Sequence, residues 1–190
     1  MTVDAIAGAI LVDVLEVGTP EHYWQYEIRP SKGEVRVILQ KEFQNHSQDI
    51  PHTFQKPAGA IAGCDERFNS EAESPDRKYV ARCRRSSLGR DELIVTDSKH
   101  SSSMSHWMPK EWRGIQGFAW APDSHSIAVL NHSEHYGKTP VEIFSGLSGH
   151  PVPHDTEFVN IIDLRSGTVT EYLVRKDVKN SFSRILSWSE

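Results

Sequence analysis

The sequence predicts an all-β protein assembled from a repeated unit of four antiparallel strands, and two observations carry this prediction. First, residues 73–81 recur in pattern as residues 120–128, and in both copies a Pro-Asp turn separates two short apolar runs. This punctuation is typical of a tight β-hairpin. Second, each hairpin is followed by a strand that ends in Asp, at residues 93–97 and 159–163. We name the four strands of a unit A, B, C and D in chain order.

The two ends of the chain supply separate parts of one further unit. Residues 182–188, which begin with Phe182 and end with Trp188, match the strand A that ends at Trp120, and no further strand follows them. Residues 5–7 match the start of strand B, and the hairpin downstream of them provides strands C and D. We therefore expect a single domain over residues 1–190 with three units: strand A at 181–189 with strands B–D at 4–42, a second unit at 67–108 and a third at 115–175.

Two segments of the third unit resemble a known repeat. Residues 118–123 read Phe-Ala-Trp-Ala-Pro-Asp and residues 160–167 read Asn-Ile-Ile-Asp-Leu-Arg-Ser-Gly, which is similar to the repeat of TolB-like and WD-type β-propellers. The likeness covers residues 67–190 and, more weakly, the N-terminal hairpin. It implies a β-propeller of four-stranded blades and says nothing of function, because propellers host many activities. The sequence departs from the family at Arg77 and Ser124, which stand where its turns carry Gly.

The number of blades predicts an assembly. Propellers close with about 4–8 blades, and three blades are too few for the C-terminal strand A to reach the rest of its own blade. We therefore expect a homodimer that exchanges this strand, from Phe182 to Trp188, and so forms six blades around a two-fold axis, the commonest oligomer symmetry. Two alternatives are a piece of a longer protein and an ordinary β-sandwich with two coincidentally similar hairpins.

Composition excludes several classes of protein. The chain of 190 residues has 21 basic and 26 acidic residues, a net charge of −5, which disfavours a nucleic-acid binder because such proteins carry surplus positive charge. No Lys or Arg precedes the apolar run at residues 5–12, so we expect no signal peptide and no membrane association. Two cysteines, Cys64 and Cys83, are too few for a disulfide framework or a four-thiolate zinc site. We expect free thiols, a buried Cys83 and a cytoplasmic location.

Strand polarity sorts the connections between strands into two rims. The A–B and C–D turns are short and share one rim, whereas the opposite rim carries two long connections at 43–66 and 131–157. Loops longer than about 12–15 residues usually have a functional reason. We expect irregular loops there that bind a ligand or seal the dimer. The candidate binding residues on or near this rim are His46, His52, Trp112, Arg113, His132, His135, His150 and His154.

The predicted function is a binding module for a protein, peptide or small ligand, presented on the long-loop rim or in the central channel. The alternatives are a small hydrolase or metal-dependent enzyme that uses the rim histidines, and a purely structural protein. Weak metal-ligand candidates are His132, His135, His150 and His154, because imidazole is a common transition-metal ligand. We predict no catalytic residues, because the segment at 146–150 lacks the final Gly of a nucleophile elbow. We also predict no cofactor.

Overall fold

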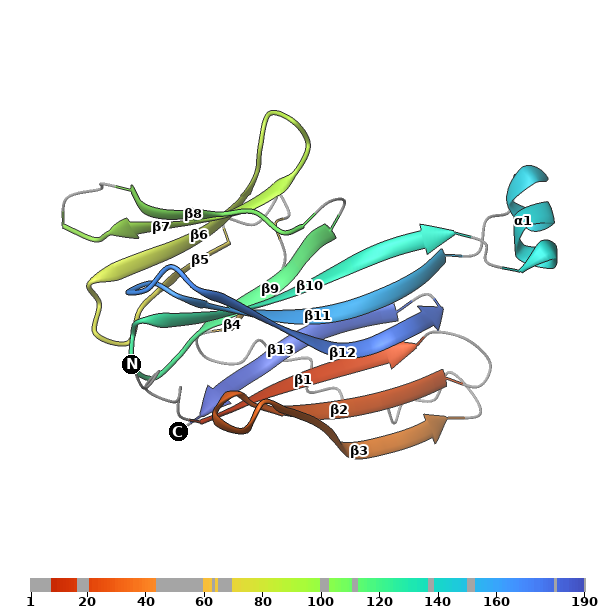
Figure 1. The fold of residues 1–190 in the computed structure, drawn as a ribbon, viewed down its shortest axis with the longest axis horizontal. Helices are drawn as coiled ribbons and strands as arrows, with labels where there is room; N and C mark the ends of the chain where they lie inside the picture. Colours follow the sequence, from red (N-terminus) through yellow and green to blue (C-terminus); the bar gives the residue numbers. More distant parts are fainter. Residues whose placement is uncertain are drawn as a thin grey trace.

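The structure is a computed structural model that describes residues 8–16, 21–43, 60–62, 64, 70–99, 103–110, 113–136, 139–149, 153–179 and 181–189. The described strands form three antiparallel sheets, which confirms the expected all-β class (Figure 1). Successive sheets pack face to face, and each contains a run of antiparallel strands that follow one another along the chain, so the arrangement is propeller-like. The described strands of this one chain form no closed ring.

The first sheet, which we call the split sheet, joins the two ends of the chain in the order β13-β1-β2-β3. In this register Ile10 lies opposite Trp188 and Leu15 opposite Phe182. The C-terminal strand therefore pairs within its own chain, and the premise that three blades cannot curve back far enough is wrong. Completing this blade requires no exchange between chains. The elements are β1 (Ala9–Glu16), β2 (Glu21–Arg29), the 3-10 helix η1 (Pro30–Lys32), β3 (Glu34–Phe43) and β13 (Ser181–Ser189).

The second sheet, the central sheet, has five strands in the order β12-β11-β10-β9-β4. The extra strand, β4, comes from the connection that we expected to be an irregular loop, and it pairs with the otherwise open edge of β9. A free strand edge exposes backbone donors and acceptors, and the added strand satisfies some of them. The strands are β4 (Ala60–Ala62), β9 (Arg113–Trp120), β10 (Ser126–Tyr136), β11 (Pro153–Asp163) and β12 (Val169–Lys179).

The third sheet, the outer sheet, has the order β5-β6-β7-β8. On its solvent side the Arg82 guanidinium pairs with Glu71, 2.7 Å away, and Arg84 pairs with Glu92. Arg82 and Arg84 of β6 therefore belong to cross-strand ion pairs. The strands are β5 (Ser70–Glu73), β6 (Tyr79–Arg85), β7 (Asp91–Asp97) and β8 (Ser103–Trp107).

The two Pro-Asp turns occupy equivalent hairpins, β5–β6 and β9–β10, as the repeat predicts. The Asp76 carboxylate accepts a hydrogen bond from the Lys78 N–H at 3.1 Å, and Asp123 accepts one from the His125 N–H at 2.8 Å. The next residue of each turn is Arg77 in one copy and Ser124 in the other, with φ of 59° and 61°. These are the positions at which the repeats that the turns resemble carry Gly, the residue that adopts positive φ without steric cost.

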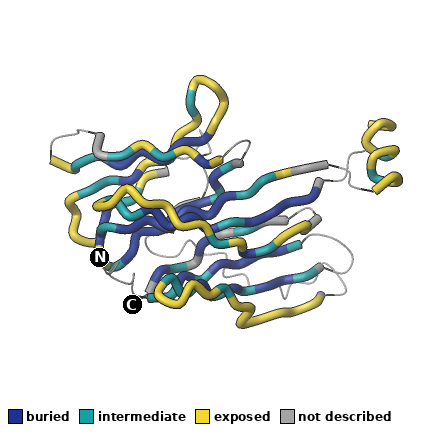
Figure 2. The backbone as a smooth tube through the Cα atoms, viewed as in Figure 1, coloured by how far each residue is buried: buried dark blue, intermediate teal, exposed yellow. Residues whose placement is uncertain are grey.

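Two apolar cores flank the central sheet. Side chains alternate along a strand, so Ala128 and Leu130 of β10 face the split sheet while Ile127 and Val129 face the outer sheet. Figure 2 shows β9, β10 and β11 of the central sheet mostly buried, whereas β12 at its edge and β3 at the edge of the split sheet are mostly exposed. The connection between β10 and β11 therefore projects from the best-buried part of the central sheet.

The cysteines overturn one expectation. Cys64 and Cys83 form a disulfide, with Cα atoms 5.2 Å apart, so the prediction of free thiols is wrong. Cys83 is buried, as expected, in strand β6. The pairing was missed because the path that brings Cys64 to β6 depends on the tertiary fold. Separately, the only described α-helix spans eight residues, too few to cross a lipid bilayer.

Candidate functional site

The hairpin formed by β10 and β11 extends well beyond the rest of the central sheet. Its pairing continues from Ser126 opposite Asp163 to Tyr136 opposite Pro153, whereas β9 accompanies β10 only as far as Ser133. At its far end lies helix α1 (Pro140–Leu147), which stands clear of the sheets in Figure 1. We call β10 from residue 131, α1 and β11 to residue 157 the arm. The irregular loop expected at 131–157 is therefore wrong for the described part of this segment.

Helix α1 begins with a capping box. The Thr139 hydroxyl accepts a hydrogen bond from the Glu142 N–H at 3.3 Å, and the Glu142 carboxylate accepts one from the Thr139 N–H at 3.1 Å. Pro140 at the first helical position suits this start because its missing N–H would have no partner there. The pattern Thr-x-x-Glu is a recognised sequence signal for a helix N-terminus. Sequence reasoning overlooked it because the glycines and prolines nearby indicated a loop.

A side-chain hydrogen bond ties α1 to β11. His154 of β11 is buried, and its Nε2 lies 2.9 Å from a Glu142 carboxylate oxygen. Hydrogen bonds from the Thr139 backbone and from His154 lower the pKa of Glu142 to about 2. Glu142 thus stays ionised over a wide pH range, caps the helix and fixes its orientation with one side chain.

The opposite side of α1 is apolar and open to solvent. Val141, Phe144 and Leu147 are 78%, 73% and 83% exposed, and Ile143 is 51% exposed. With about 3.6 residues per turn these four side chains share one side of the helix, away from Glu142. Large apolar side chains that cluster in solvent commonly mark an interaction site.

The base of the arm carries a second cluster, made of ionisable side chains. His132 and Glu134 alternate along β10, and Asp155 lies directly opposite Glu134 on β11, so all three side chains share one face. Their potential ligand atoms all lie within 4.8 Å of one another. Glu157, opposite His132, is only 1% exposed and accepts a hydrogen bond from the Ser183 hydroxyl at 2.7 Å.

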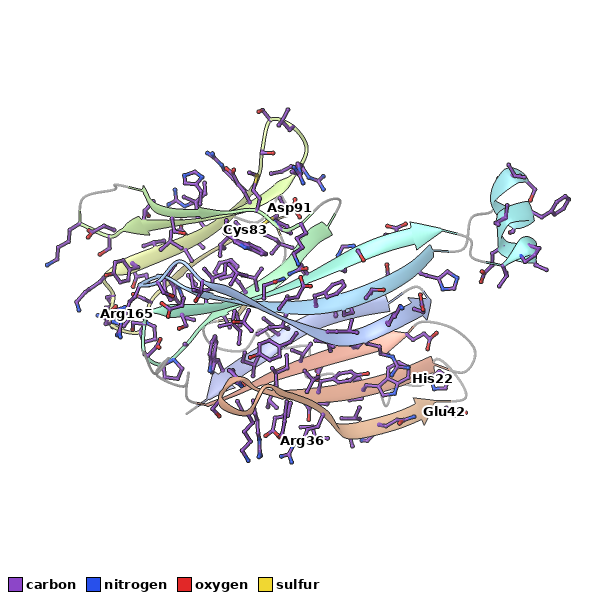
Figure 3. The ribbon with its side chains drawn as sticks, in the orientation of Figure 1. His22, Arg36, Glu42, Cys83, Asp91 and Arg165 are labelled. Atoms are coloured by element: carbon purple, nitrogen blue, oxygen red, sulfur yellow. A yellow bond between two sulfur atoms is a disulfide. The ribbon has the colours of Figure 1, made fainter. Side chains whose placement is uncertain are left out.

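Neighbours from β9 hold the His132 ring in place. The Gln116 amide nitrogen, Nε2, lies 2.7 Å from His132 Nδ1. A Cβ at Gly114 would come within 2.9 Å of His132 Cε1, so the imidazole occupies the space that this glycine leaves open. The Asp91 carboxylate borders the same space, 3.6 Å from that Cβ position. It accepts a hydrogen bond from the Ile115 N–H at 2.9 Å and so joins the start of β7 to β9 (Figure 3).

The structure brings only some of the candidate residues together. His132 and His154 lie on the arm, and the backbone of His135 pairs with that of His154 across the hairpin. Arg113 is the first residue of β9, opposite Ser133, away from the tip of the arm. His46, His52, Trp112 and His150 lie outside the described residues, and so do the side chains of Arg113 and His135.

Sequence reasoning missed the acidic members of the cluster, Glu134, Asp155 and Glu157. A usable signal existed, because acids at positions 155 and 157 alternate directly before the apolar strand at 159–162. Treating residues 131–157 as a loop removed the reason to test for this alternation. Gln116, the partner of His132, lies at an irregularity in the β9–β10 pairing. No sequence pattern predicts this irregularity.

Comparison with known proteins yields structures of low similarity. No family model matches the sequence, and no curated protein matches it. Among solved structures, the acylaminoacyl peptidase of Pyrococcus horikoshii aligns over 93% of this chain and 25% of its own, with 14% identity and a TM-score of 0.36. The β-propeller domain of the Trilobed protease from Pyrococcus furiosus aligns over 88% of this chain and 44% of its own, with 15% identity and a TM-score of 0.35.

A third structure, an acylaminoacyl peptidase in complex with Z-Gly-Gly-Phe-chloromethyl ketone, aligns over 93% of this chain and 25% of its own, with 13% identity and a TM-score of 0.39. This chain therefore spans less than half the length of each of these structures. Scores at this level do not establish a shared fold, and nothing about this chain is inferred from the activities of these proteins.

Proposed function

We propose that this chain is a binding module whose recognition element is the apolar side of α1. One observation carries the proposal: Val141, Phe144 and Leu147 are more than 70% exposed on a helix that stands outside the sheets (Figure 2). The Glu142–His154 pair holds the helix by its polar side. The apolar side is therefore presented outward rather than packed on the protein's own core.

The partner that fits this surface is a protein with an apolar groove about one helix wide. Laying the apolar side of a short helix into such a groove is a common mode of recognition. Each large side chain that is fully buried in this way contributes about 1.5–3 kcal/mol. The surface is convex, whereas small ligands bind in concave pockets, so a protein partner suits α1 better than a small molecule does.

A selection experiment tests the proposal. Proteins from a displayed library are selected against the immobilised chain, and each binder is then measured with the Phe144→Asp and Leu88→Asp variants. Leu88 is a matched control because it is 83% exposed, like Leu147, but lies between β6 and β7. We expect the Phe144 variant to lose more than about 30-fold in affinity, as for an interface hot spot. Binders that respond to Leu88 and ignore Phe144 would refute the proposal.

We further propose that two chains associate into a six-bladed dimer. Three sheets are fewer than the roughly 4–8 blades of a closed ring, and the edge strand β3 exposes Val37, Ile38 and Leu39 in succession. Large apolar side chains clustered in solvent commonly mark an interface with another chain. The pairing of β13 with β1 could form within a chain, as in this structure, or by exchange. Light scattering should give twice 21.5 kDa, and a folded monomer at micromolar concentration would contradict the dimer.

Three other expectations stay predictions: membership of the TolB-like or WD-type propellers, a hydrolytic or metal-dependent activity, and a purely structural role. The cytoplasmic location also stays a prediction, and the Cys64–Cys83 disulfide weighs against it. Disulfides persist mainly in oxidising compartments and are rare in the cytosol of mesophiles.

A further inference from the structure

The geometry points to a divalent metal site at the base of the arm, formed by His132, Glu134 and Asp155, with Zn²⁺ as the ion that fits best. Imidazole nitrogen and carboxylate oxygen together form a donor set that Zn²⁺ accepts, whereas Mg²⁺ and Ca²⁺ prefer oxygen alone. Three protein ligands would leave one position of a tetrahedral ion for water. This inference does not depend on whether α1 binds a partner.

The three side chains need little movement to reach bonding geometry. Their ligand atoms already lie within 4.8 Å of one another. Around a tetrahedral Zn²⁺ with bonds of about 2.0–2.2 Å, ligand atoms are about 3.4 Å apart. Rotation of the exposed Glu134 side chain would account for most of the decrease in these distances, because the other two residues are more buried.

A neighbour on β9 is placed to support His132 in the manner of a metal ligand. Metal-bound histidines commonly use their second ring nitrogen for a hydrogen bond that fixes the ring. The Gln116 amide nitrogen lies 2.7 Å from His132 Nδ1, and Gly114 leaves the room that the ring fills. A turn of the Gln116 amide, which exchanges its nitrogen and oxygen, would let the oxygen accept the Nδ1 proton and leave Nε2 of the ring for the metal. Gln116 is thus a positioning residue for the site.

The charge of the arm also suits a cation. Asp155 and Glu157 are 8% and 1% exposed and place two acidic side chains on the same face of the hairpin. A bound ion would join β10 to β11 where the hairpin leaves the support of β9.

The test is a zinc titration of the purified full chain after treatment with a chelator. Calorimetry with ZnCl₂ should show one saturable site per chain, and thermal unfolding should shift upward with ZnCl₂ more than with MgCl₂. Glu134→Gln, which changes an exposed side chain and should fold normally, and Asp155→Asn should each weaken binding by more than about 100-fold. Gln116→Ala should weaken it by about 10–100-fold, the usual effect of losing such a support.

His106→Asn is the matched control, because His106 is an exposed histidine of β8, remote from the arm. It should leave the affinity for Zn²⁺ unchanged. Binding that is equally strong in Glu134→Gln and in the original chain would overturn the proposal, as would a titration with no saturable site. Equal weakening by His106→Asn would also overturn it, because zinc would then bind surface histidines without selecting the arm.

Discussion

Replacing Arg77 with glycine should stabilise the protein, although it removes a long side chain. Arg77 has a φ of 59° in the β5–β6 turn, and a non-glycine residue in this left-handed region costs about 1–2 kcal/mol. Glycine avoids this cost but makes the unfolded chain more flexible, which costs about 0.4–1 kcal/mol. The expected net gain in the free energy of unfolding is therefore about 1 kcal/mol. For a chain of this size it corresponds to a rise in Tm of about 2–4 °C.

Ser124 provides the matched comparison, with a φ of 61° in the equivalent turn. Its hydroxyl accepts a hydrogen bond from the Asp76 N–H at 3.0 Å and so joins the turns of the outer and central sheets. Losing this acceptor at a buried site costs about 1–3 kcal/mol. Ser124→Gly should therefore be neutral or destabilising, even though glycine also removes the cost of a positive φ at this position.

Urea denaturation of both variants, with Arg77→Ala as a control for the lost side chain, measures these effects. Arg77→Ala keeps the backbone cost and should not stabilise. The reasoning would be refuted if Arg77→Gly destabilised the protein as much as Ser124→Gly, because backbone strain would then not govern this turn.

Three further predictions concern single contacts. Replacing both Cys64 and Cys83 with Ser should lower the free energy of unfolding by about 3 kcal/mol, as expected for a loop closed over 19 residues, and a change below 1 kcal/mol would contradict a structural role. Arg175 lies 3.5 Å above the Trp24 ring, so Arg175→Met should lower the free energy of unfolding by about 1–2 kcal/mol in chemical denaturation. An unchanged free energy of unfolding would contradict a stabilising role for this contact. The Ser74 hydroxyl is the main cause that lowers the pKa of Asp76 from 3.8 to about 2. The stabilisation of the fold by ionised Asp76 is thus complete above about pH 4 and lost as the pH falls through about 2. Asp76→Asn should therefore flatten the dependence of Tm on pH over this range.

Local patterns were enough to predict the strand order but not the contacts between distant segments. The Pro-Asp turns at Pro75 and Pro122 punctuate the chain, and turn chemistry is local, so the hairpins could be located from sequence. The pairing of the 181–189 strand with the N-terminal strands could be predicted from the repeat. The disulfide, and the fact that β13 completes the blade of its own chain, depend on how successive sheets curve, which no local pattern encodes. This curvature also brings Ser183 to Glu157, a contact between segments far apart in the sequence.

The arm was predicted incorrectly for a different reason. Its signals, the Thr139–Glu142 capping box and the alternation of His132 with Glu134, were present in the sequence. They were read as a loop because Gly146 and Gly149 lie close by, and glycine is a strong indicator of turns. Gly149, with a φ of 84°, in fact lies just beyond the end of the helix. Glycine commonly ends a helix in this way.

Hydrogen exchange, measured on the chain alone and with a selected protein binder, shows whether α1 is the recognition element. We expect increased protection in α1 and its flanks, residues 139–149, where binding would cover the apolar side. We expect no change in the Pro-Asp turns at 75–78 and 122–125, which lie at the opposite ends of the strands. Protection confined to those turns, with none in α1, would contradict the assignment of recognition to the arm.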